Sequence, residues 1–403
     1  MTLARIGLAY LRTRKLATTL TIALLALGVA AVTLVFLTSA QLERRLDRDA
    51  RDIDLVVGPK GSPTQLVLAS LYGLDVPSGS VRWDTVQMLC AEPGVQAVIP
   101  VTLGDHYHGT RIVGTTRAYL DHYAARVQDG RAWQAPLEAV LGADVAARVR
   151  LAIGSTFIAS HGLQRNVGEA HPARPYRIVG VLGRTGTLVD RLVLTDVSSY
   201  WTLHPQSTPE DNDLVAEPAP DDGRTVSAVL VRCTSASTVA NVAAYVNARD
   251  ELQAVSPAEE TARLLEIAAL NVDLLKAFAA VLLLSAGLTL FLALYHGLNE
   301  RRYDVAVMRT LGATRGNVMS LLLFEGVLLA LAGTIVGLPL GHALTSLMGF
   351  AMTRMQQFSV TGAFWHPAEL WIVALALAIG ALAAIVPAWR AREIDIAGTL
   401  ARG

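Results

Sequence analysis

Long runs of residues without formal charge constrain the fold of this chain more than any other feature of its sequence. Residues 16–42, 277–299 and 370–389 carry no charge, and Glu325 alone interrupts 316–353. Each run is long enough for a helix to cross the hydrocarbon core of a bilayer, which takes roughly 20 residues. The composition, 52% hydrophobic against 17% charged, agrees with this. The sequence therefore predicts an α-helical membrane protein with four transmembrane helices, at 16–40, 276–299, 317–348 and 369–389.

A short charged segment, 300–316, separates the second and third runs. It carries four arginines and must turn at one membrane surface, which the positive-inside rule assigns to the cytosol. The predicted cytosolic segments, 1–15, 300–316 and 390–403, then hold 11 basic and 4 acidic residues, a net charge of +7. Residues 41–273 hold 21 basic and 28 acidic residues, a net charge of −7. We therefore expect both termini in the cytosol and a large domain on the other side.

Residues 1–15 predict an amphipathic helix on the cytosolic membrane surface, because apolar residues recur at helical spacing among basic ones. A cleaved signal peptide is the alternative interpretation. The apolar run that follows is too long for the core of a signal peptide, which favours the first transmembrane helix.

Both borders of the outer region, 41–275, predict helices that continue from the membrane as stalks. After the first run, Leu42, Leu46 and Ala50 are spaced by four residues. Before the second run, Ser256 can cap a helix that has Pro257 at its first position and a glutamate three residues after the cap.

Between the stalks, roughly 200 residues have the composition of a folded domain. Short β-branched runs alternate with helical patterns, so we expect a mixed α+β domain, with an exposed acidic loop at 208–223. The predicted strands are 54–58, 94–101, 110–114, 176–182, 191–195 and 227–232, and the predicted helices are 82–91, 143–150 and 237–249.

Residues 55–80 form an unusual insertion just beyond the first stalk. They contain Pro59, Pro63 and Pro77, glycines that include Gly61 and Gly79, and an apolar stretch at 66–74. The segment is either a partner-facing loop or helical hairpin, or it packs onto the domain core, and the sequence does not choose between these.

Cysteines and histidines in the outer region give two weaker hypotheses. Cys90 and Cys233 lie where a disulfide is permitted, although two separate thiols are the plainer interpretation. His106 and His108 would share one face of a strand and could offer two metal ligands. Because no third ligand lies nearby at metal spacing, solvated loop histidines are favoured, and no metal site is predicted.

The motifs of nucleotide binding and hydrolysis are absent from the sequence. The three lysines are Lys15, Lys60 and Lys276, and none follows a glycine, so there is no phosphate-binding loop. Gly-x-Ser-x-Gly and His-Glu-x-x-His are absent as well. We expect a non-catalytic chain that itself holds no cofactor and binds no nucleic acid.

Two features of the third apolar run call for partners. Glu325 would cost about 3 kcal/mol in hydrocarbon, so we expect a bond to a neighbouring helix or to the charged segment, rather than a role in moving protons. Gly333, Gly337 and Gly341 form a ridge that lets another helix approach closely. The second span or a second membrane protein of the same kind could fill this ridge.

At this point the chain resembles the FtsX-like permeases of the MacB type, the membrane subunits of type VII ABC transporters. The resemblance is carried by Glu300-Arg301-Arg302 followed by Ala306-Val307-Met308-Arg309-Thr310-Leu311-Gly312-Ala313, by Glu325 and the glycine ridge, and by Pro387-Ala388-Trp389-Arg390. In the outer region, Gly114-Thr115, Val140-Leu141-Gly142 and Ile178-Val179-Gly180 resemble the periplasmic core domain of that family.

The resemblance implies four transmembrane helices in a bacterial inner membrane, with the α+β domain in the periplasm between spans one and two. It also implies that 300–316 contains a coupling helix for a separate ABC-type ATP-binding subunit, which would hold ATP and Mg²⁺. An apolar side made by Ala306, Met308, Leu311 and Ala313 is consistent with docking. The implied coupling residues are Glu300, Arg301, Arg302, Val307, Met308, Arg309, Leu311, Gly312 and Ala313, and the residues expected at packing contacts or interfaces are Glu325, Gly333, Gly337, Gly341 and Pro387.

The expected function is that of a permease that couples ATP hydrolysis on its partner to a periplasmic conformational change. It would export or extract a lipoprotein, a peptide or another hydrophobic substrate, as a dimer with itself or a related permease. Membrane lipid and a periplasmic or lipoprotein partner complete the expected contacts. Two alternatives remain: mechanical activation of a periplasmic enzyme without transport, and a membrane sensor without an ATPase.

Overall fold

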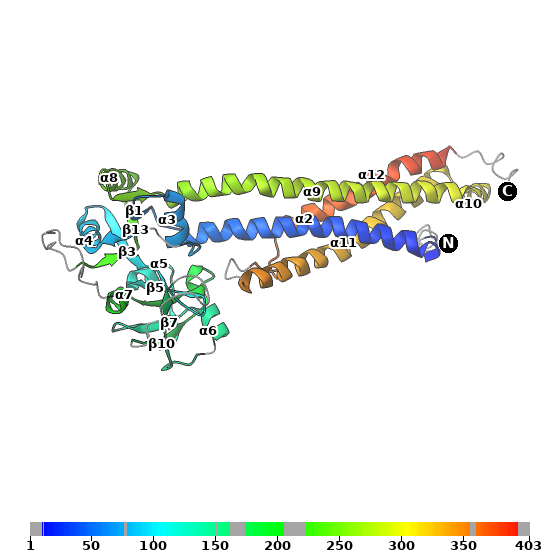
Figure 1. The fold of residues 1–403 in the computed structure, drawn as a ribbon. Coiled ribbons are helices and arrows are strands. Elements are labelled where there is room, and N and C mark those ends of the chain that lie inside the picture. Colours follow the sequence, from blue (N-terminus) through cyan, green and yellow to red (C-terminus); the bar gives the residue numbers. More distant parts are fainter. Residues whose placement is uncertain are drawn as a thin grey trace. The chain divides into compact units, whose positions relative to one another are not determined.

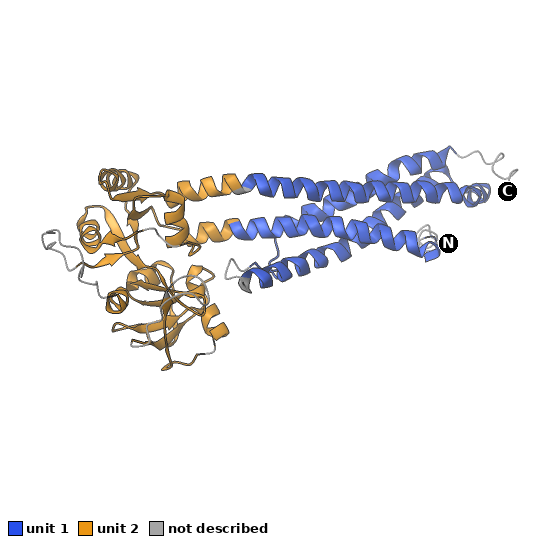
Figure 2. Ribbon diagram, in the orientation of Figure 1, with its two compact units in different colours: residues 1–42, 268–403 blue, residues 43–267 orange. Residues whose placement is uncertain are grey.

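The computed structural model describes residues 10, 12–75, 79–149, 151–161, 174–204, 223–354 and 360–393. The chain divides into two compact units (Figure 2). The helical unit comprises residues 1–42 and 268–403, and the α+β unit comprises residues 43–267.

In the described part of the chain, four helices are long and apolar enough to cross a membrane, as predicted. They are α2 (Lys15–Asp49), α9 (Pro257–Glu300), α11 (Arg315–Arg354) and α12 (Glu369–Arg392), and a short helix, α10 (Arg302–Thr310), lies between α9 and α11 (Figure 1). α2 continues to Asp49 and α9 begins at Pro257, so both stalk predictions are confirmed.

Glycines bring the long helices of the helical unit into close contact. A Cβ atom on Gly333, Gly337 or Gly341 of α11 would lie 2.6 or 2.7 Å from the Cβ atoms of Leu25, Val29 and Thr33 on α2. The first span therefore fills the glycine ridge. Both occupants that the sequence suggested, the second span and a second permease, are wrong, because the pattern shows that a helix approaches but not which one.

Further glycines, which the sequence did not single out, mark the remaining contacts between helices. Gly326 of α11 faces Gly380 of α12, where an added Cβ on Gly380 would meet the Ala330 Cβ at 2.4 Å. Gly28 of α2 lies against Leu283 of α9, and an added Cβ on Gly287 would meet Ile379 of α12. Together with the ridge, these contacts pack α2, α11, α12 and α9 in turn.

Two exposed tryptophans on α12 have the spacing expected of the two membrane interfaces. Trp371 and Trp389 are 18 residues apart, a helical distance of about 27 Å, close to the thickness of a hydrocarbon core. Tryptophan is enriched at membrane interfaces. Ile372, next to Trp371, packs in one cluster with Leu283 of α9 and Val29 of α2, and this cluster continues along α12 to Ala376 and Ile379.

The α+β unit is built on one mixed sheet with strand order β14-β1-β13-β3-β5-β11-β7-β10-β6. These strands are β14 (Leu252–Val255), β1 (Leu55–Pro59), β13 (Ala228–Cys233), β3 (Val95–Thr102), β5 (Thr110–Thr115), β11 (Val193–Asp196), β7 (Glu138–Leu141), β10 (Tyr176–Leu182) and β6 (Val127–Gly130). The short strands are β4 (Asp105–Tyr107), paired with β5 and β9 (Ser160–His161); β8 (Thr156–Phe157), paired with β10; and β2 (Val81–Arg82), paired with β12 (Thr225–Val226).

Helices of the α+β unit cover two separate apolar clusters. The helices are α3 (Pro63–Ser70), α4 (Trp83–Ala91), α5 (Arg117–His122), α6 (Ala143–Val149), α7 (Val197–Leu203) and α8 (Ala236–Asn247), with a 3₁₀ turn at Leu188–Arg191. One cluster joins α4 and α8 to β1 and β13, and the other joins α6 to β7, β10 and β11 (Figure 1).

Every predicted strand and helix of this domain is present, with limits shifted by at most two residues. The sequence missed the other strands of two to four residues, β11 excepted, and the short helices α3, α5 and α7. Segments this short do not repeat a hydrophobic pattern often enough to reveal their type.

The insertion at 55–80 packs onto the core, which settles the alternatives left by the sequence. Leu66, Val67, Leu71 and Tyr72 in and after α3 are buried. The Leu66 side chain lies where a Cβ on Gly58 would be, so α3 sits tightly against β1.

The histidine hypotheses are corrected by the backbone around β4. His106 is buried on the strand, whereas His108 lies in the following turn with φ 45°. The two side chains therefore do not share a strand face, and His106 is not a solvated loop residue. Among the residues with described surroundings there is no group of three metal-ligating side chains.

Cys90 on α4 and Cys233 at the end of β13 are both free thiols in the structure, so the disulfide considered from the sequence is not formed. Most of 1–15, the loop at 208–222, the tail at 394–403 and His171, a further histidine of the outer region, lie outside the described residues, and the expectations for these segments stay predictions.

Candidate functional site

The charged segment between α9 and α11 folds into α10 and a tight turn at one end of the helical unit. Arg301 is the residue that precedes the first turn of α10, and Leu311 follows the last. Gly312 then adopts φ 98°, a left-handed conformation that strains residues with a side chain, and α11 begins at Arg315. The Gly312 turn thus reverses the chain between α10 and α11.

One face of α10 is fixed to the helical unit. Val305 and Ala306 are buried, and Met308 packs against them in a cluster. The other members of this cluster come from the ends of the long helices and are Leu298, Val318, Leu322, Ala388 and Ala391. The apolar side expected for docking is therefore divided, because Ala306 and Met308 are used internally.

The other face of α10 is exposed. Tyr303 on α10 is exposed, and Leu311, directly after the helix, is 83% exposed. The polar residues exposed around them are Arg302, Asp304, Thr310 and Arg315. An apolar side chain surrounded by charges at a membrane surface has the composition of a protein contact.

Glu325, the lone carboxylate within the third apolar run, is bonded to Arg301. The Arg301 guanidinium donates to both carboxylate oxygens at 3.1–3.3 Å, and the side chains are 14% and 4% exposed. The expectation that Glu325 has a partner in the charged segment is confirmed. Because the pair is nearly buried, losing either partner leaves an uncompensated charge.

A wider polar network surrounds this pair. The Arg301 guanidinium lies 4.1 Å from the centre of the Tyr10 ring, and Tyr10 donates a hydrogen bond of 3.1 Å to Asp304 on α10. Glu300 forms an ion pair with Arg14. The junction of α9 and α10 is thereby held to both the N-terminal segment and α11.

The end of α12 lies in the same region, since Ala388 and Ala391 pack in the cluster with Val305. Arg390 donates a hydrogen bond of 2.6 Å to the Tyr295 hydroxyl of α9, and Trp389 donates to Glu393 at 3.1 Å. Pro387 is buried within α12.

In the α+β unit, Tyr72 connects the two stalk helices, which the sequence did not reveal. Its hydroxyl oxygen lies 2.6 Å from Thr261 Oγ1 on α9 and 3.4 Å from the Leu46 carbonyl oxygen on α2. Thr64 also donates to Glu260 on α9 at 2.7 Å. The insertion that carries Tyr72 and Thr64 is therefore the link between the stalks.

The end of α2 is anchored in the same unit through its own polar groups. Asp49 accepts a hydrogen bond of 2.8 Å from the Leu188 amide, and Arg48 donates to the Gly186 carbonyl at 2.9 Å. These two hydrogen bonds fix the end of α2 to residues 186–188 of the same unit.

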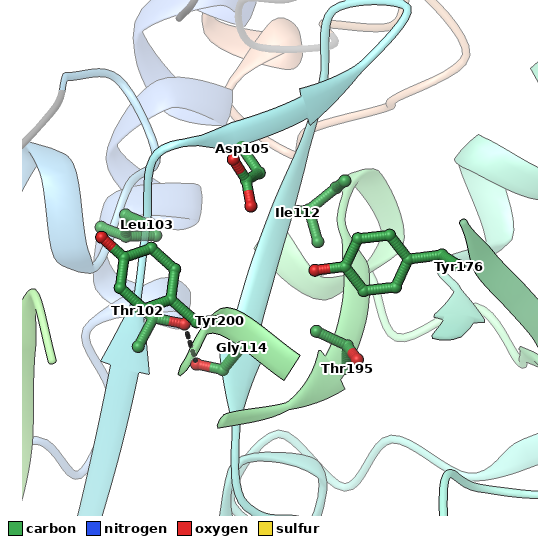
Figure 3. A pocket seen from close by; sticks show the side chains of 8 residues that line it. All are labelled: Thr102, Leu103, Asp105, Ile112, Gly114, Tyr176, Thr195 and Tyr200. Carbon is green, nitrogen blue, oxygen red and sulfur yellow. Dashed lines mark hydrogen bonds between the residues drawn. The ribbon is translucent and has the colours of Figure 1, made fainter. Parts of the chain in front are cut away.

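A polar cavity in the α+β unit has room for about one water molecule, which excludes an organic substrate (Figure 3). Asp105 lines it and lies 3.3 Å from His204 Nε2. Burial, and secondly the charge of Asp105, raises the pKa of the Tyr200 hydroxyl. The residues lining the cavity are Thr102, Leu103, Asp105, Ile112, Gly114, Tyr176, Thr195 and Tyr200.

Comparison with known families decides what this architecture represents. Residues 18–249 match the model of the MacB-like periplasmic core domain, and residues 276–396 match the model of the FtsX-like permease C-terminal. The first match alone covers more than half of the chain. The chain belongs to the MacB-type FtsX-like permeases. The resemblance stated from its motifs is thereby confirmed, and the protein is an ABC transporter permease with a periplasmic domain between its first two spans.

Among curated proteins, the permease is 24% identical over 151 residues to the uncharacterized ABC transporter permease YknZ of Bacillus subtilis, covering 36% of this chain and 35% of that protein. It is 29% identical over 115 residues to the lipoprotein-releasing system transmembrane protein LolC of Xylella fastidiosa, covering 25% and 28%. It is 32% identical over 132 residues to the macrolide export ATP-binding/permease protein MacB of Nitrobacter winogradskyi, covering 32% and 19%. The matches thus span about a third or less of these relatives.

Solved structures were also compared. The extracellular domain of YknZ from Gram-positive bacteria aligns at a TM-score of 0.32 and 16% identity, covering 51% of this chain and 99% of that one. The periplasmic region of MacB from Actinobacillus actinomycetemcomitans aligns at 0.35 and 11%, covering 54% and 95%.

Proposed function

We propose that this permease couples ATP hydrolysis on a separate ABC-type ATP-binding subunit to movement of its periplasmic domain. The partner would hold ATP and Mg²⁺, since the present sequence has no phosphate-binding loop. The docking surface would be the exposed face of α10 around Leu311, with both chain termini on the same, cytosolic side.

The Arg301–Glu325 pair is the observation that carries this proposal. Arg301 ends α9 and starts α10, while Glu325 lies within α11. A force applied to α10 would therefore act on α9 and α11 together. α9 has 44 residues, about 66 Å of continuous helix, which is long enough to carry displacement well beyond the bilayer. At its far end, Tyr72 would pass that displacement to α2.

The substrate would be handled outside the bilayer instead of crossing an aqueous pore. Close glycine contacts pack the described parts of the helices against one another, which favours a mechanical bundle. Relatives named for lipoprotein release and macrolide export suggest a lipoprotein, a peptide or another hydrophobic substrate.

A second permease copy, identical or related, would complete the transporter through α9. Apolar side chains at helical spacing are exposed along that helix, at Ile267, Leu270, Leu274, Phe278, Val281 and Leu288. Gly287 of α9 lies level with Ile379, which is eight residues beyond Trp371, so Leu274 and the residues before it would extend about 7 Å or more beyond the hydrocarbon. There, lipid tails cannot cover them, and a second α9 would.

The coupling proposal is tested by purifying the permease with the products of neighbouring genes and measuring a bound ATP-binding protein. Leu311→Glu is expected to reduce that binding at least tenfold. Ile153→Glu, at another exposed apolar residue in the α+β unit, is the matched control and should leave it unchanged.

If no ATP-binding protein is bound by the unmodified permease, the sensor without an ATPase replaces the transporter. The ATPase could bind while a periplasmic hydrolase is activated and nothing is exported or extracted. In that case, mechanical activation of an enzyme replaces transport as the proposed function.

A further inference from the structure

A carboxylate and an imidazole meet in the α+β unit, where the end of α7 approaches β4. Asp105 is the first residue of β4, and its buried side chain lines the small polar cavity (Figure 3). His204 directly follows α7, and its Nε2 atom lies 3.3 Å from Asp105 Oδ2. The two residues are 99 positions apart in the chain, so only the fold brings them together.

The separation of these two atoms is long for a simple ion pair. A charge-assisted hydrogen bond from an imidazolium to a carboxylate spans about 2.7–2.9 Å. Two ligands of a tetrahedral Zn²⁺ ion, each about 2.0–2.1 Å from the metal, lie roughly 3.3 Å apart. Imidazole nitrogens and carboxylate oxygens are both common ligands of this ion. The distance between Asp105 and His204 therefore matches that between two neighbouring ligands of one metal ion.

A third residue of a metal-binding type occupies the neighbouring strand. His161 on β9 stands directly opposite Asp105 in the antiparallel register of β4 and β9. Residues in such positions have Cβ atoms about 4.5–5.5 Å apart on one face of the sheet. This register position is within reach of an ion held by Asp105. Two imidazoles and one carboxylate form a ligand set that Zn²⁺ accepts, with a water molecule in the fourth position.

The surroundings of Asp105 suit a bound cation. The Asp105 side chain is 4% exposed and the His204 side chain 20%, so an ion can enter from the side of the imidazole. A buried carboxylate is costly unless a positive charge lies beside it, and a divalent ion supplies that charge. The cavity next to Asp105 has room for about one water molecule, which would complete the coordination.

We propose that Asp105, His161 and His204 bind one Zn²⁺ ion, or a divalent transition-metal ion with similar ligand preference, in the periplasmic domain. The ion would join β4, β9 and the end of α7. None of the three residues belongs to α10 or to the stalk helices, so the site does not depend on the proposed ATP-binding subunit.

The histidine pair that the sequence suggested, His106 and His108, takes no part in this site. Adjacent residues of a strand face opposite sides of the sheet, and His106 stands opposite Arg111 in the register of β4 and β5. The three proposed ligands are too widely spaced in the chain to form a local metal-binding motif, which is why the sequence did not reveal them.

Zinc binding by the full-length permease tests the site. The protein is purified in detergent without a histidine tag, stripped with a chelator, and titrated with Zn²⁺ in competition with a chromogenic chelator. One Zn²⁺ ion should bind per chain. Asp105→Asn, His161→Ala and His204→Ala should each lower the affinity by at least about tenfold, since losing even an outer-shell partner of a metal ligand costs that much.

His108→Asn is the matched control. This histidine is exposed in the turn after β4 and has φ 45°, a conformation that asparagine tolerates. Its affinity for Zn²⁺ should equal that of the unmodified permease. Equal affinity in His204→Ala and the unmodified protein, or no bound Zn²⁺ in either, would show that Asp105 and His204 form a metal-free ion pair. Unchanged affinity in His161→Ala would overturn the three-residue site.

A stability measurement keeps the proposal testable if Asp105→Asn folds poorly. His204 is partly exposed, so His204→Ala is expected to remain folded. Excess Zn²⁺ should raise the unfolding temperature of the unmodified permease and of His108→Asn, because a ligand that binds only the folded state stabilises it. The same excess should leave the unfolding temperature of His204→Ala unchanged, and an equal rise in that variant contradicts the proposal.

Discussion

Arg301 and Glu325 face each other where α9 ends and α10 begins, with both carboxylate oxygens accepting from one guanidinium in a nearly water-free contact. The pair joins a residue of the charged segment to the interior of a membrane-spanning helix. It thus connects the surface proposed for docking with the helices that would carry movement to the periplasmic domain.

Removing one partner of this pair should destabilise the permease strongly. Glu325→Ala leaves Arg301 buried without a counter-charge, at an expected cost of about 3–5 kcal/mol. The double variant Arg301→Met with Glu325→Leu replaces both charges by apolar groups and should recover most of that loss. Thermal unfolding in detergent compares the two, and a double variant no more stable than the single one contradicts the buried-pair interpretation.

The glycine ridge should tolerate no added side chain. In Gly337→Val, the new Cβ would lie 2.7 Å from the Val29 Cβ, so α2 and α11 must separate, at a cost of about 1–3 kcal/mol or more. Gly316→Ala, where the nearest atom to a Cβ is a Thr314 hydroxyl oxygen at 3.7 Å, is the matched control. The unfolding temperature of Gly337→Val should lie several degrees below that of Gly316→Ala. Equal unfolding temperatures would show that α2 does not pack closely against the ridge.

Tyr72→Phe should weaken the link between the stalks while leaving the ring in the core. The lost hydroxyl contacts to Thr261 and Leu46 are expected to cost about 1 kcal/mol of folding stability. The larger expected effect is on coupling: substrate release per ATP hydrolysed should fall severalfold while ATP hydrolysis continues. Tyr245→Phe, at an exposed tyrosine of α8, should change neither quantity. Unaltered coupling in Tyr72→Phe would show that the Tyr72 hydroxyl does not transmit movement between the stalk helices.

Acid should weaken the periplasmic domain through Glu138. Hydrogen bonds from the Arg131 guanidinium lower the pKa of Glu138 to about 2. Partial burial opposes this shift, and a hydrogen bond from the Gln134 amide adds to it. Because the folded-state pKa lies below the unfolded value of 4.5, this stabilisation is present above about pH 4.5 and is lost as the pH falls towards 2. Glu138→Gln should lower stability at pH 6 and flatten that acid dependence in chemical unfolding. An unchanged profile would show that the ion pair contributes little.

Much of the architecture could be predicted, because its signals are local. The uncharged runs gave the transmembrane helices, and Ser256, Pro257 and Glu259 gave the start of α9. In the candidate site, the sequence identified the charged segment 300–316 and its residue Leu311. It predicted, however, that Ala306, Met308, Leu311 and Ala313 form one continuous apolar side. Ala306 and Met308 turn inward because α10 packs on residues as distant as Ala391, which no local pattern records.

The sequence by itself determined the number of membrane-spanning helices and the place of the α+β domain between the first two, and its charge distribution predicts their sidedness. Hydrophobic length and charge balance act on each segment separately, so they can be read without a fold. Only the tertiary structure decided that α2 fills the glycine ridge, that Arg301 is the partner of Glu325, and that Tyr72 ties the two stalk helices together. These contacts join residues that lie far apart in the chain. Several residues could have served each as a chemically equivalent partner, and only the packing of the folded chain shows which of them does.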